Sequence, residues 1–269
     1  MTVRFLQTTA IVLRYYYLIR GSFTRFVPLF VWVTIDMLLW GFMSRYLNSV
    51  ASTTFNFVPA LLGAVLLWDF LTRVMHGVTT VFFEDVWSRN FLNVFATPLR
   101  ISEYLGGLVL ASIGTSAIGL AIMVAVATLL FGLPVVAYGA AAGPFLLLLF
   151  VFGIALGIAG TAMVLVLGPA AEWFVWPIPA ILAPFAGVYY PISALPVWMQ
   201  AVARILPASY VFEGVRSISG GRVFPASGLF AAGLLSLLYL LIACVVFSRV
   251  YRRAVRTGAL ARYTAETVS

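Results

Sequence analysis

Long apolar runs separated by short polar segments dominate the chain. A helix needs about 20 apolar residues to cross the hydrocarbon core of a bilayer. Runs of this kind occur near residues 27–47, 57–82, 105–131, 144–168, 173–190 and 228–248. The pattern predicts an all-α membrane protein with six transmembrane helices. The fifth run is short and carries Pro177, Pro179 and Pro184.

The first 26 residues have a different pattern. Their arginines are spread throughout rather than placed ahead of one apolar core, so the segment is not typical of a secretory signal. On a helix, one sector is apolar and the opposite one polar: Phe5, Val12, Leu13 and Tyr16 against Arg4, Gln7 and Arg14. Residues 1–26 are therefore predicted to form an amphipathic helix in the cytoplasmic headgroup region. The alternative is a basic flank that only fixes the topology.

The arginines predict the orientation of the chain. With six spans both termini lie on one side, and the basic residues are unevenly divided between the two sides. One side holds Arg4, Arg14, Arg20, Arg25, Arg89, Arg100, Arg249, Arg252, Arg253, Arg256 and Arg262, and the other holds Arg45, Arg204, Arg216 and Arg222. Because basic residues collect on the cytoplasmic side, both termini are expected there. Residues 27–248 then form the transmembrane domain, and residues 249–269 a basic cytoplasmic tail.

Composition excludes several classes of protein. The chain is 63% hydrophobic and 9% charged, whereas soluble domains carry roughly 25% charged residues. A soluble enzyme, a nucleic-acid binder and a disordered chain are therefore excluded, and the net charge of +8 reflects topology. All 16 basic residues are arginine, so the chain lacks the lysine of a P-loop ATPase. One histidine and one cysteine (Cys244) exclude a disulfide framework and a zinc site built from several such ligands. No catalytic, cofactor-binding or metal site is expected.

The loop after the second run could bind another protein. Residues 84–97 begin with acidic residues, which favour the start of a helix, and Pro98 would end it. Phe91, Leu92 and Phe95 fall on one face of this segment, and its flanks are charged or aromatic: Glu84, Trp87 and Arg89. Exposed aromatic side chains of this kind favour docking to a partner. The alternative is packing on the protein's own membrane face.

The second run contains the intramembrane charges. Asp69 and Arg73 lie four residues apart and His76 follows three later, so all three share one helix face. Charges at this depth face the protein interior, pair with each other or line water. The stripe is interpreted as a gating or substrate-contacting surface, with a structural ion pair or a proton relay as alternatives. Asp36 in the first run is a candidate partner for Arg73 or for its copy in a second subunit.

The segment between the fifth and sixth runs is cut by prolines into pieces too short to span a bilayer. Short helices at membrane depth persist only when packed in protein or lining a cavity. Residues 190–210 are predicted to form a re-entrant helical hairpin on the extracytoplasmic side. Its candidate residues, with those beside it, are Gly187, Pro191, Pro196, Trp198, Pro207, Tyr210, Glu213 and Arg216.

These residues carry a family resemblance. The series Gly-x-x-x-Pro, Leu-Pro-x-Trp-x-Gln, Leu-Pro-x-x-Tyr and Glu-x-x-Arg from Gly187 to Arg216, with Thr97-Pro98-Leu99, resembles the ABC-2 type permeases of bacterial ABC exporters. The resemblance implies a homodimer joined to two copies of an ABC nucleotide-binding subunit, which bind ATP and Mg. Residues 84–97 would be the coupling helix, and the hairpin would cover the exit route.

The resemblance also implies a location and a cargo. The chain would be the permease subunit of an ATP-driven exporter in the bacterial cytoplasmic (inner) membrane, surrounded by lipid. It would move an amphipathic or lipid-linked substrate: a polysaccharide, a glycolipid or a hydrophobic drug. Two other classes stay open. They are a proton-coupled secondary transporter that uses Asp69, Arg73 and His76, and a membrane scaffold. An inverted repeat would favour the secondary transporter, and none is visible in the sequence.

Overall fold

The computed structural model describes residues 2–51, 56–88, 90, 93–94, 97, 99–133, 142–219 and 225–257. The regular elements in this part of the chain are all helices, which confirms the all-α prediction. They are α1 (Thr2–Arg20), α2 (Phe23–Phe26), α3 (Pro28–Val50), η1 (Val58–Leu62), α4 (Gly63–Trp87), α6 (Ile101–Phe131), α8 (Ala142–Leu167), η3 (Pro169–Ala171), α9 (Glu172–Val175), α10 (Ile178–Ala186), η4 (Ile192–Ala194), α11 (Val197–Ala203), α12 (Pro207–Ser219) and α13 (Ala226–Arg256).

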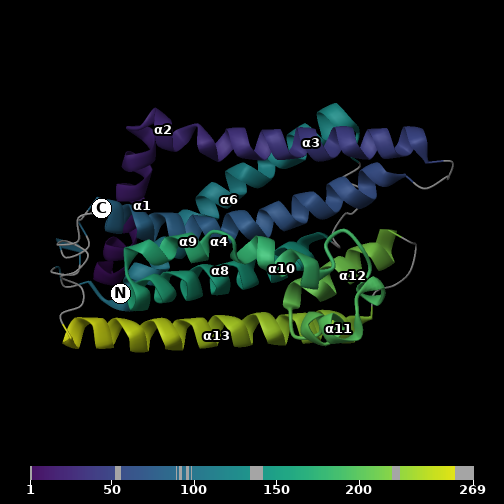
Figure 1. Ribbon diagram of the computed structural model, residues 1–269. Helices are drawn as coiled ribbons and strands as arrows, with labels where there is room; N and C mark the ends of the chain where they lie inside the picture. Colours follow the sequence, from purple (N-terminus) through teal and green to yellow (C-terminus); the bar gives the residue numbers. More distant parts are fainter. Residues whose placement is uncertain are drawn as a thin grey trace.

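Five helical stretches of the described residues are long and apolar enough to cross a membrane. They are Phe23–Val50, Val58–Trp87, Ile101–Phe131, Gly143–Leu167 and Ala226–Arg256. Figure 1 shows these helices running along one common direction, with α1 and the end of α13 at the same end of the molecule. The predicted number of six spans is not confirmed, because the fifth predicted span is not one continuous helix.

The fifth predicted span is broken into η3, α9 and α10, and proline and glycine explain the breaks. Gly168 has a φ of +94° and so separates α8 from η3, because residues with a side chain rarely adopt this conformation. Pro177 separates α9 from α10, and Gly187 ends α10 with a φ of +62°. In Figure 1, α9 lies near the end that carries the termini and α10 lies nearer α12. The segment therefore follows the long axis without a continuous helix.

Helix α4 lies at the centre of the bundle and packs against both α6 and α8. A Cβ atom added at Gly157 of α8 would lie 2.7 Å from Cβ of Val78 and 2.9 Å from the carbonyl oxygen of Met75. The two helices thus approach as closely as glycine permits, as is typical of helices packed in lipid. Towards α6, the Ser112 hydroxyl donates a hydrogen bond of 2.8 Å to the carbonyl oxygen of Val74.

Helices α3 and α13 form the two outer sides of the bundle and expose many large apolar side chains. Helix α3 packs chiefly against α6 and η1, and α13 packs chiefly against α8. Trp32 and Phe42 on α3 and Leu234 and Leu241 on α13 are all more than half exposed. In a membrane such surfaces contact lipid or another subunit.

Helix α1 crosses the ends of the long helices near the termini (Figure 1). Its inward face carries Ile11 and Tyr15, which are buried, and it packs against α6. Leu13 and Tyr16, both in the predicted apolar sector, are exposed. A helix across the bundle with exposed apolar side chains is the shape expected of an interfacial helix. The sequence pattern did not identify the inward face.

Candidate functional site

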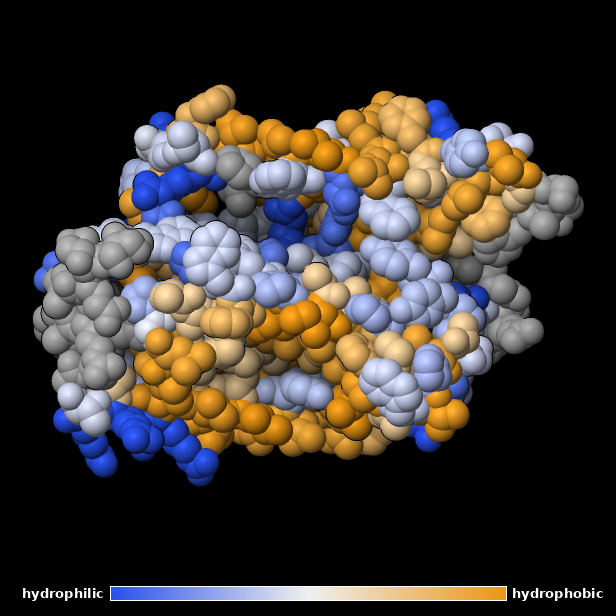
Figure 2. Space-filling view, viewed as in Figure 1, coloured by the Kyte–Doolittle hydropathy of each residue, from blue (hydrophilic) through white to orange (hydrophobic). Residues whose placement is uncertain are grey.

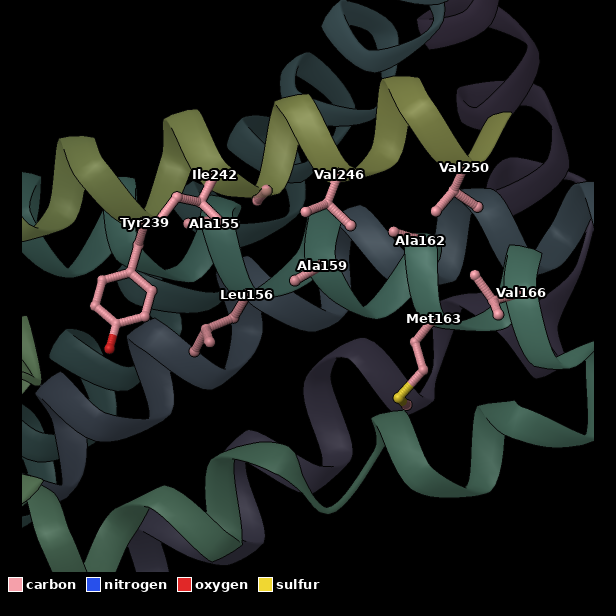
Figure 3. A pocket seen from close by; sticks show the side chains of 11 residues that line it. Ala155, Leu156, Ala159, Ala162, Met163, Val166, Tyr239, Ile242, Val246 and Val250 are labelled. Atoms are coloured by element: carbon pink, nitrogen blue, oxygen red, sulfur yellow. The ribbon is translucent and has the colours of Figure 1, made fainter. Parts of the chain in front are cut away.

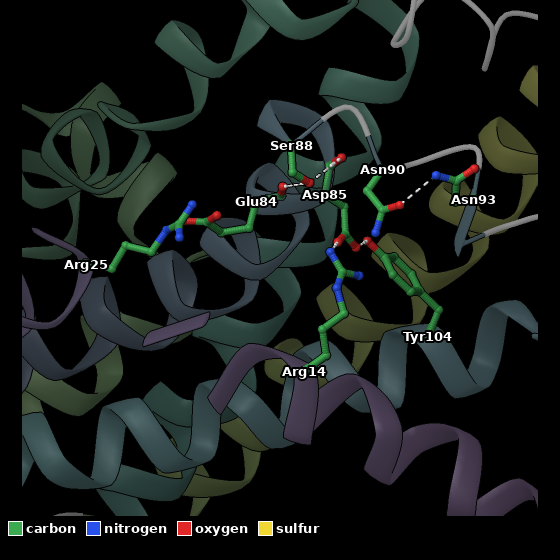
Figure 4. A network of polar contacts seen from close by, with 8 residues as sticks. All are labelled: Arg14, Arg25, Glu84, Asp85, Ser88, Asn90, Asn93 and Tyr104. Carbon is green, nitrogen blue, oxygen red and sulfur yellow. Dashed lines mark hydrogen bonds and ion pairs between the residues drawn. The ribbon is translucent and has the colours of Figure 1, made fainter. Parts of the chain in front are cut away.

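The end of α4 nearest the termini carries a cluster of buried charges (Figure 4). The Asp85 side chain is only 2% exposed and forms an ion pair with Arg14 of α1. It also accepts a hydrogen bond of 2.8 Å from the hydroxyl of Tyr104, a fully buried residue near the start of α6. One carboxylate therefore joins α1, α4 and α6.

Glu84, the preceding residue, joins the same helix end to α2. Its carboxylate accepts a hydrogen bond of 2.8 Å from Nε of Arg25, and its side chain is buried. Tyr15 of α1 lies in the same electrostatic environment. Burial raises its pKa to about 12, Glu84 adds to the rise, and Arg25 opposes it. The Tyr15 hydroxyl therefore stays protonated at neutral pH.

The last turn of α4 is also held by α9, part of the broken fifth span. The indole nitrogen of Trp87 donates a hydrogen bond of 2.7 Å to the carboxylate of Glu172, the first residue of α9. The Ser88 hydroxyl donates to the carbonyl oxygen of Glu84 at 2.6 Å. The backbone N–H of Asn90 donates to the carbonyl oxygen of Asp85 at 3.1 Å. Together with α1, α2 and α6, helix α9 thus holds the point at which the chain leaves α4.

This geometry corrects part of the predicted docking segment. Glu84 and Trp87 were expected on a separate short helix, but they form the last turn of α4. The buried Glu84 carboxylate forms an ion pair with Arg25, because a buried charge needs a partner. Glu84 therefore does not belong to an exposed docking surface. The other predicted docking residues, Arg89, Phe91, Leu92 and Phe95, lie outside the described residues.

The residues of the predicted intramembrane stripe contact different neighbours of α4, and Asp69 contacts α3. Figure 2 shows hydrophilic atoms within a hollow between α3 and the helices beneath it. Asp69 lies within electrostatic reach of Arg73, and its side chain also interacts with that of Asp36 on α3. Asp36 was a candidate partner for Arg73 or for its copy in a second subunit, and within this chain it meets Asp69. The Arg73 side chain lies against Gly119 of α6.

Two pairs of aromatic rings lie beside this stripe. The His76 ring packs edge-on against Trp176, with centroids 4.7 Å apart, and its Nε2 atom is buried without a hydrogen-bond partner in the described part of the chain. Trp40 of α3 stacks on Tyr189 at 4.8 Å and an interplanar angle of 14°. Tyr189 also interacts electrostatically with both Asp36 and Asp69. The cleft thus combines carboxyl groups, a guanidinium group and stacked aromatic rings.

Beyond α10, three of the predicted hairpin residues meet at one point. Nη2 of Arg216 donates to the carbonyl oxygen of Gly187 at 2.7 Å and pairs with the Glu213 carboxylate at 3.1 Å. The same carboxylate accepts a hydrogen bond of 2.8 Å from the N–H of Ile192. These hydrogen bonds join residues that lie 21 and 29 positions apart in the sequence. They fix the turn that follows α10.

The remaining hairpin candidates shape the short helices. Pro196 precedes α11 and Pro207 begins α12, as is common at helix starts. The Tyr210 hydroxyl donates to the carbonyl oxygen of Arg204 at 2.9 Å. Trp198 is 63% exposed and packs edge-on against Phe185. The last candidate, Pro191, directly precedes η4. The short helices match the predicted pieces, and a re-entrant path through the membrane stays a prediction.

Comparison with protein families matches residues 7–219 to the ABC-2 type transporters. The match covers most of the chain and includes the charge cluster, the intramembrane stripe and the hairpin residues. The chain belongs to the ABC-2 type transporter family. This ABC-2 protein is a membrane component of a transporter, and members of the family pair in general with an ATPase subunit. Comparison with curated proteins gives no significant match.

Several residues of the ABC-2 protein's site were not predicted. The charge cluster around Glu84, Asp85 and Trp87 is completed by four unpredicted residues: Arg14, Arg25, Tyr104 and Glu172. A fifth unpredicted residue, Tyr189, contacts the stripe. A signal did exist for the cluster. Acidic residues are rare in this chain, with eight in total, so two adjacent ones at a helix end needed cationic partners from another segment.

Proposed function

We propose that this chain is the permease subunit of an ATP-driven exporter in the bacterial cytoplasmic membrane. Two copies form a homodimer and bind two nucleotide-binding subunits, which carry ATP and Mg. The cargo is an amphipathic or lipid-linked molecule: a polysaccharide, a glycolipid or a hydrophobic drug. Both termini face the cytosol, and the chain crosses the membrane six times, with the broken segment Pro169–Ala186 as the fifth crossing.

The observation that carries this proposal is the charge cluster at the end of α4. A coupling segment must transmit a displacement of the ATPase to the membrane helices, so its base has to be joined rigidly to several of them. Asp85 and Glu84 join the base of residues 88–100 to α1, α2 and α6, and Trp87 joins it to α9. A push on this segment would therefore move the central helix α4 together with the interfacial helix α1.

The hollow between α3 and α4 supplies a candidate substrate route. Asp36, Asp69 and Arg73 offer hydrogen bonds and charge, and the stacked rings of Trp40 and Tyr189 offer flat apolar faces. Such a surface suits a molecule with both polar and apolar parts. The contact between Asp36 and Asp69 also supports a second candidate, a proton-coupled secondary transporter, because paired carboxyl groups at membrane depth can carry protons.

Purification with the candidate ATPase tests the proposal and separates the two candidates. The chain is co-expressed with a candidate Walker-type ATPase and reconstituted into vesicles. Candidate lipids, glycans and drugs are then screened for stimulation of ATP hydrolysis. The exporter predicts a stable complex and transport that persists when the proton gradient is collapsed with ATP held constant. Loss of all transport under that condition would favour the secondary transporter.

A further inference from the structure

An apolar groove lies between α8 and α13, on the outer side of the bundle. Its volume is about 320 Å³. The floor contains small buried residues, Ala155, Ala162 and Ala243, whereas Ile242 and Val166 on the rim are more than half exposed. In Figure 3, Tyr239, Val246 and Val250 project from α13 towards α8, where Ala155, Ala159 and Ala162 lie. The other lining residues are Leu156, Ala159, Met163, Tyr239, Val246 and Val250.

The length of the groove corresponds to one leaflet of a bilayer. Tyr239 lies at one end and Val250 and Val166 lie at the other (Figure 3). The eleven steps from Tyr239 to Val250 rise by about 16 Å at 1.5 Å per residue. The hydrocarbon core of a bilayer is about 30 Å thick, so one leaflet takes up about half of that. A single acyl chain could lie in the groove along its whole length.

Positive charge is placed where the groove ends. Arg253 follows Val250 by three residues, so it continues the lining face of α13 beyond the groove. Arg249 lies one turn before Arg253, beside the end of the groove. Both side chains are exposed. Arg252, also exposed, points away from this face because it lies 100° from Arg253 around the helix. In Figure 2, hydrophilic atoms gather at this end of α13, directly beyond a continuous apolar surface.

We propose that this groove is a binding site for an anionic phospholipid of the cytoplasmic leaflet. One acyl chain fills the groove against the alanine floor, and the phosphate group binds Arg253 and Arg249. The lipid is a bound component of the membrane rather than the transported substrate. This inference goes beyond the proposed transport function. It uses the proposed orientation of α13, which cysteine labelling tests independently.

The test measures lipid retention by the full chain. The protein is purified in mild detergent, equilibrated with equal amounts of phosphatidylglycerol and phosphatidylcholine, and analysed by native mass spectrometry. The wild type should retain phosphatidylglycerol in preference. Ala159→Phe fills the groove from an exposed position and should abolish this retention. Arg253→Gln should weaken it about five-fold, the contribution of one basic residue near a membrane surface.

Two matched controls separate the site from general effects on the protein. Arg252→Gln removes the same charge from the other side of α13, and Leu241→Phe adds bulk on an exposed position away from the groove. Both variants should retain phosphatidylglycerol like the wild type. Equal retention of the two lipids by the wild type would overturn the proposal. So would unchanged retention in Ala159→Phe and Arg253→Gln, or cross-linking of cysteines at Ile242 that shows a second copy covering the groove.

Discussion

Removing the Asp85 carboxylate should destabilise the contact between α1 and the transmembrane bundle. Asp85→Ala deprives two partners at once, the fully buried hydroxyl of Tyr104 and the guanidinium of Arg14. An unsatisfied buried hydroxyl costs about 1–3 kcal/mol. Breaking a fully buried ion pair costs roughly 3–5 kcal/mol, but the Arg14 side chain is 31% exposed and can turn to water. The expected loss in the free energy of unfolding is therefore about 3 kcal/mol.

The assay is unfolding of the full chain in mixed micelles titrated with sodium dodecyl sulfate. A double-mutant cycle with Arg14→Ala should show that the two changes are not additive, with a coupling energy of about 1–2 kcal/mol. Arg20→Ala, an exposed residue of the same helix, is the control and should change the stability little. The reasoning is refuted if Asp85→Ala costs less than about 0.5 kcal/mol, the usual range of surface changes, or if the two changes simply add.

Three further predictions concern packing, the hairpin and topology. Gly157→Ala should destabilise the protein by about 1–3 kcal/mol through overpacking against α4. The control Gly143→Ala places its methyl group in open space and should leave the stability unchanged, so equal unfolding curves for the two variants would contradict this prediction. Arg216→Lys should lower the free energy of unfolding by about 1–2 kcal/mol, since lysine lacks the planar fork of donors; full stability would remove the assigned role of Arg216. Single cysteines at Asn93 and Ile205, in a background without the native cysteine, should be labelled from the cytosol and from outside respectively, and labelling of both from one side would contradict the orientation.

The sequence predicted the continuous helices well because lipid imposes a simple rule. An apolar run of sufficient length forms a helix, since backbone groups have no other partners in hydrocarbon. The prediction was weaker where proline and glycine compete with that rule. The segment after Gly168 is apolar enough to cross, yet Pro177 divides it into α9 and α10. Hydropathy alone does not show where such a segment breaks.

The candidate site was predicted in part, and the missing part is its long-range pairing. The spacing of Asp69 and Arg73 along one helix predicted that they share a face of α4, and the two lie within electrostatic reach of each other. In contrast, Arg14 and Asp85 lie 71 residues apart, and no local pattern identifies such a pair. Gly187, Glu213 and Arg216 were selected from their motif, but only the structure shows that they bind one another.

The most direct test of the central claim, ATP-driven transport through a partner ATPase, is the double variant Phe91→Ala, Phe95→Ala. An aromatic hot spot at an interface contributes about 2 kcal/mol or more. If one of the two rings is such a hot spot, the partner should bind at least about 30-fold more weakly, or should hydrolyse ATP without moving substrate. Trp198→Ala, which truncates an exposed aromatic residue on the predicted opposite side of the membrane, should keep both binding and coupling. The measurement is co-purification of the ATPase together with substrate-stimulated ATP hydrolysis. The account predicts that the double variant inserts and dimerises normally but loses ATPase binding or substrate-stimulated hydrolysis. Wild-type binding together with wild-type coupling would contradict it.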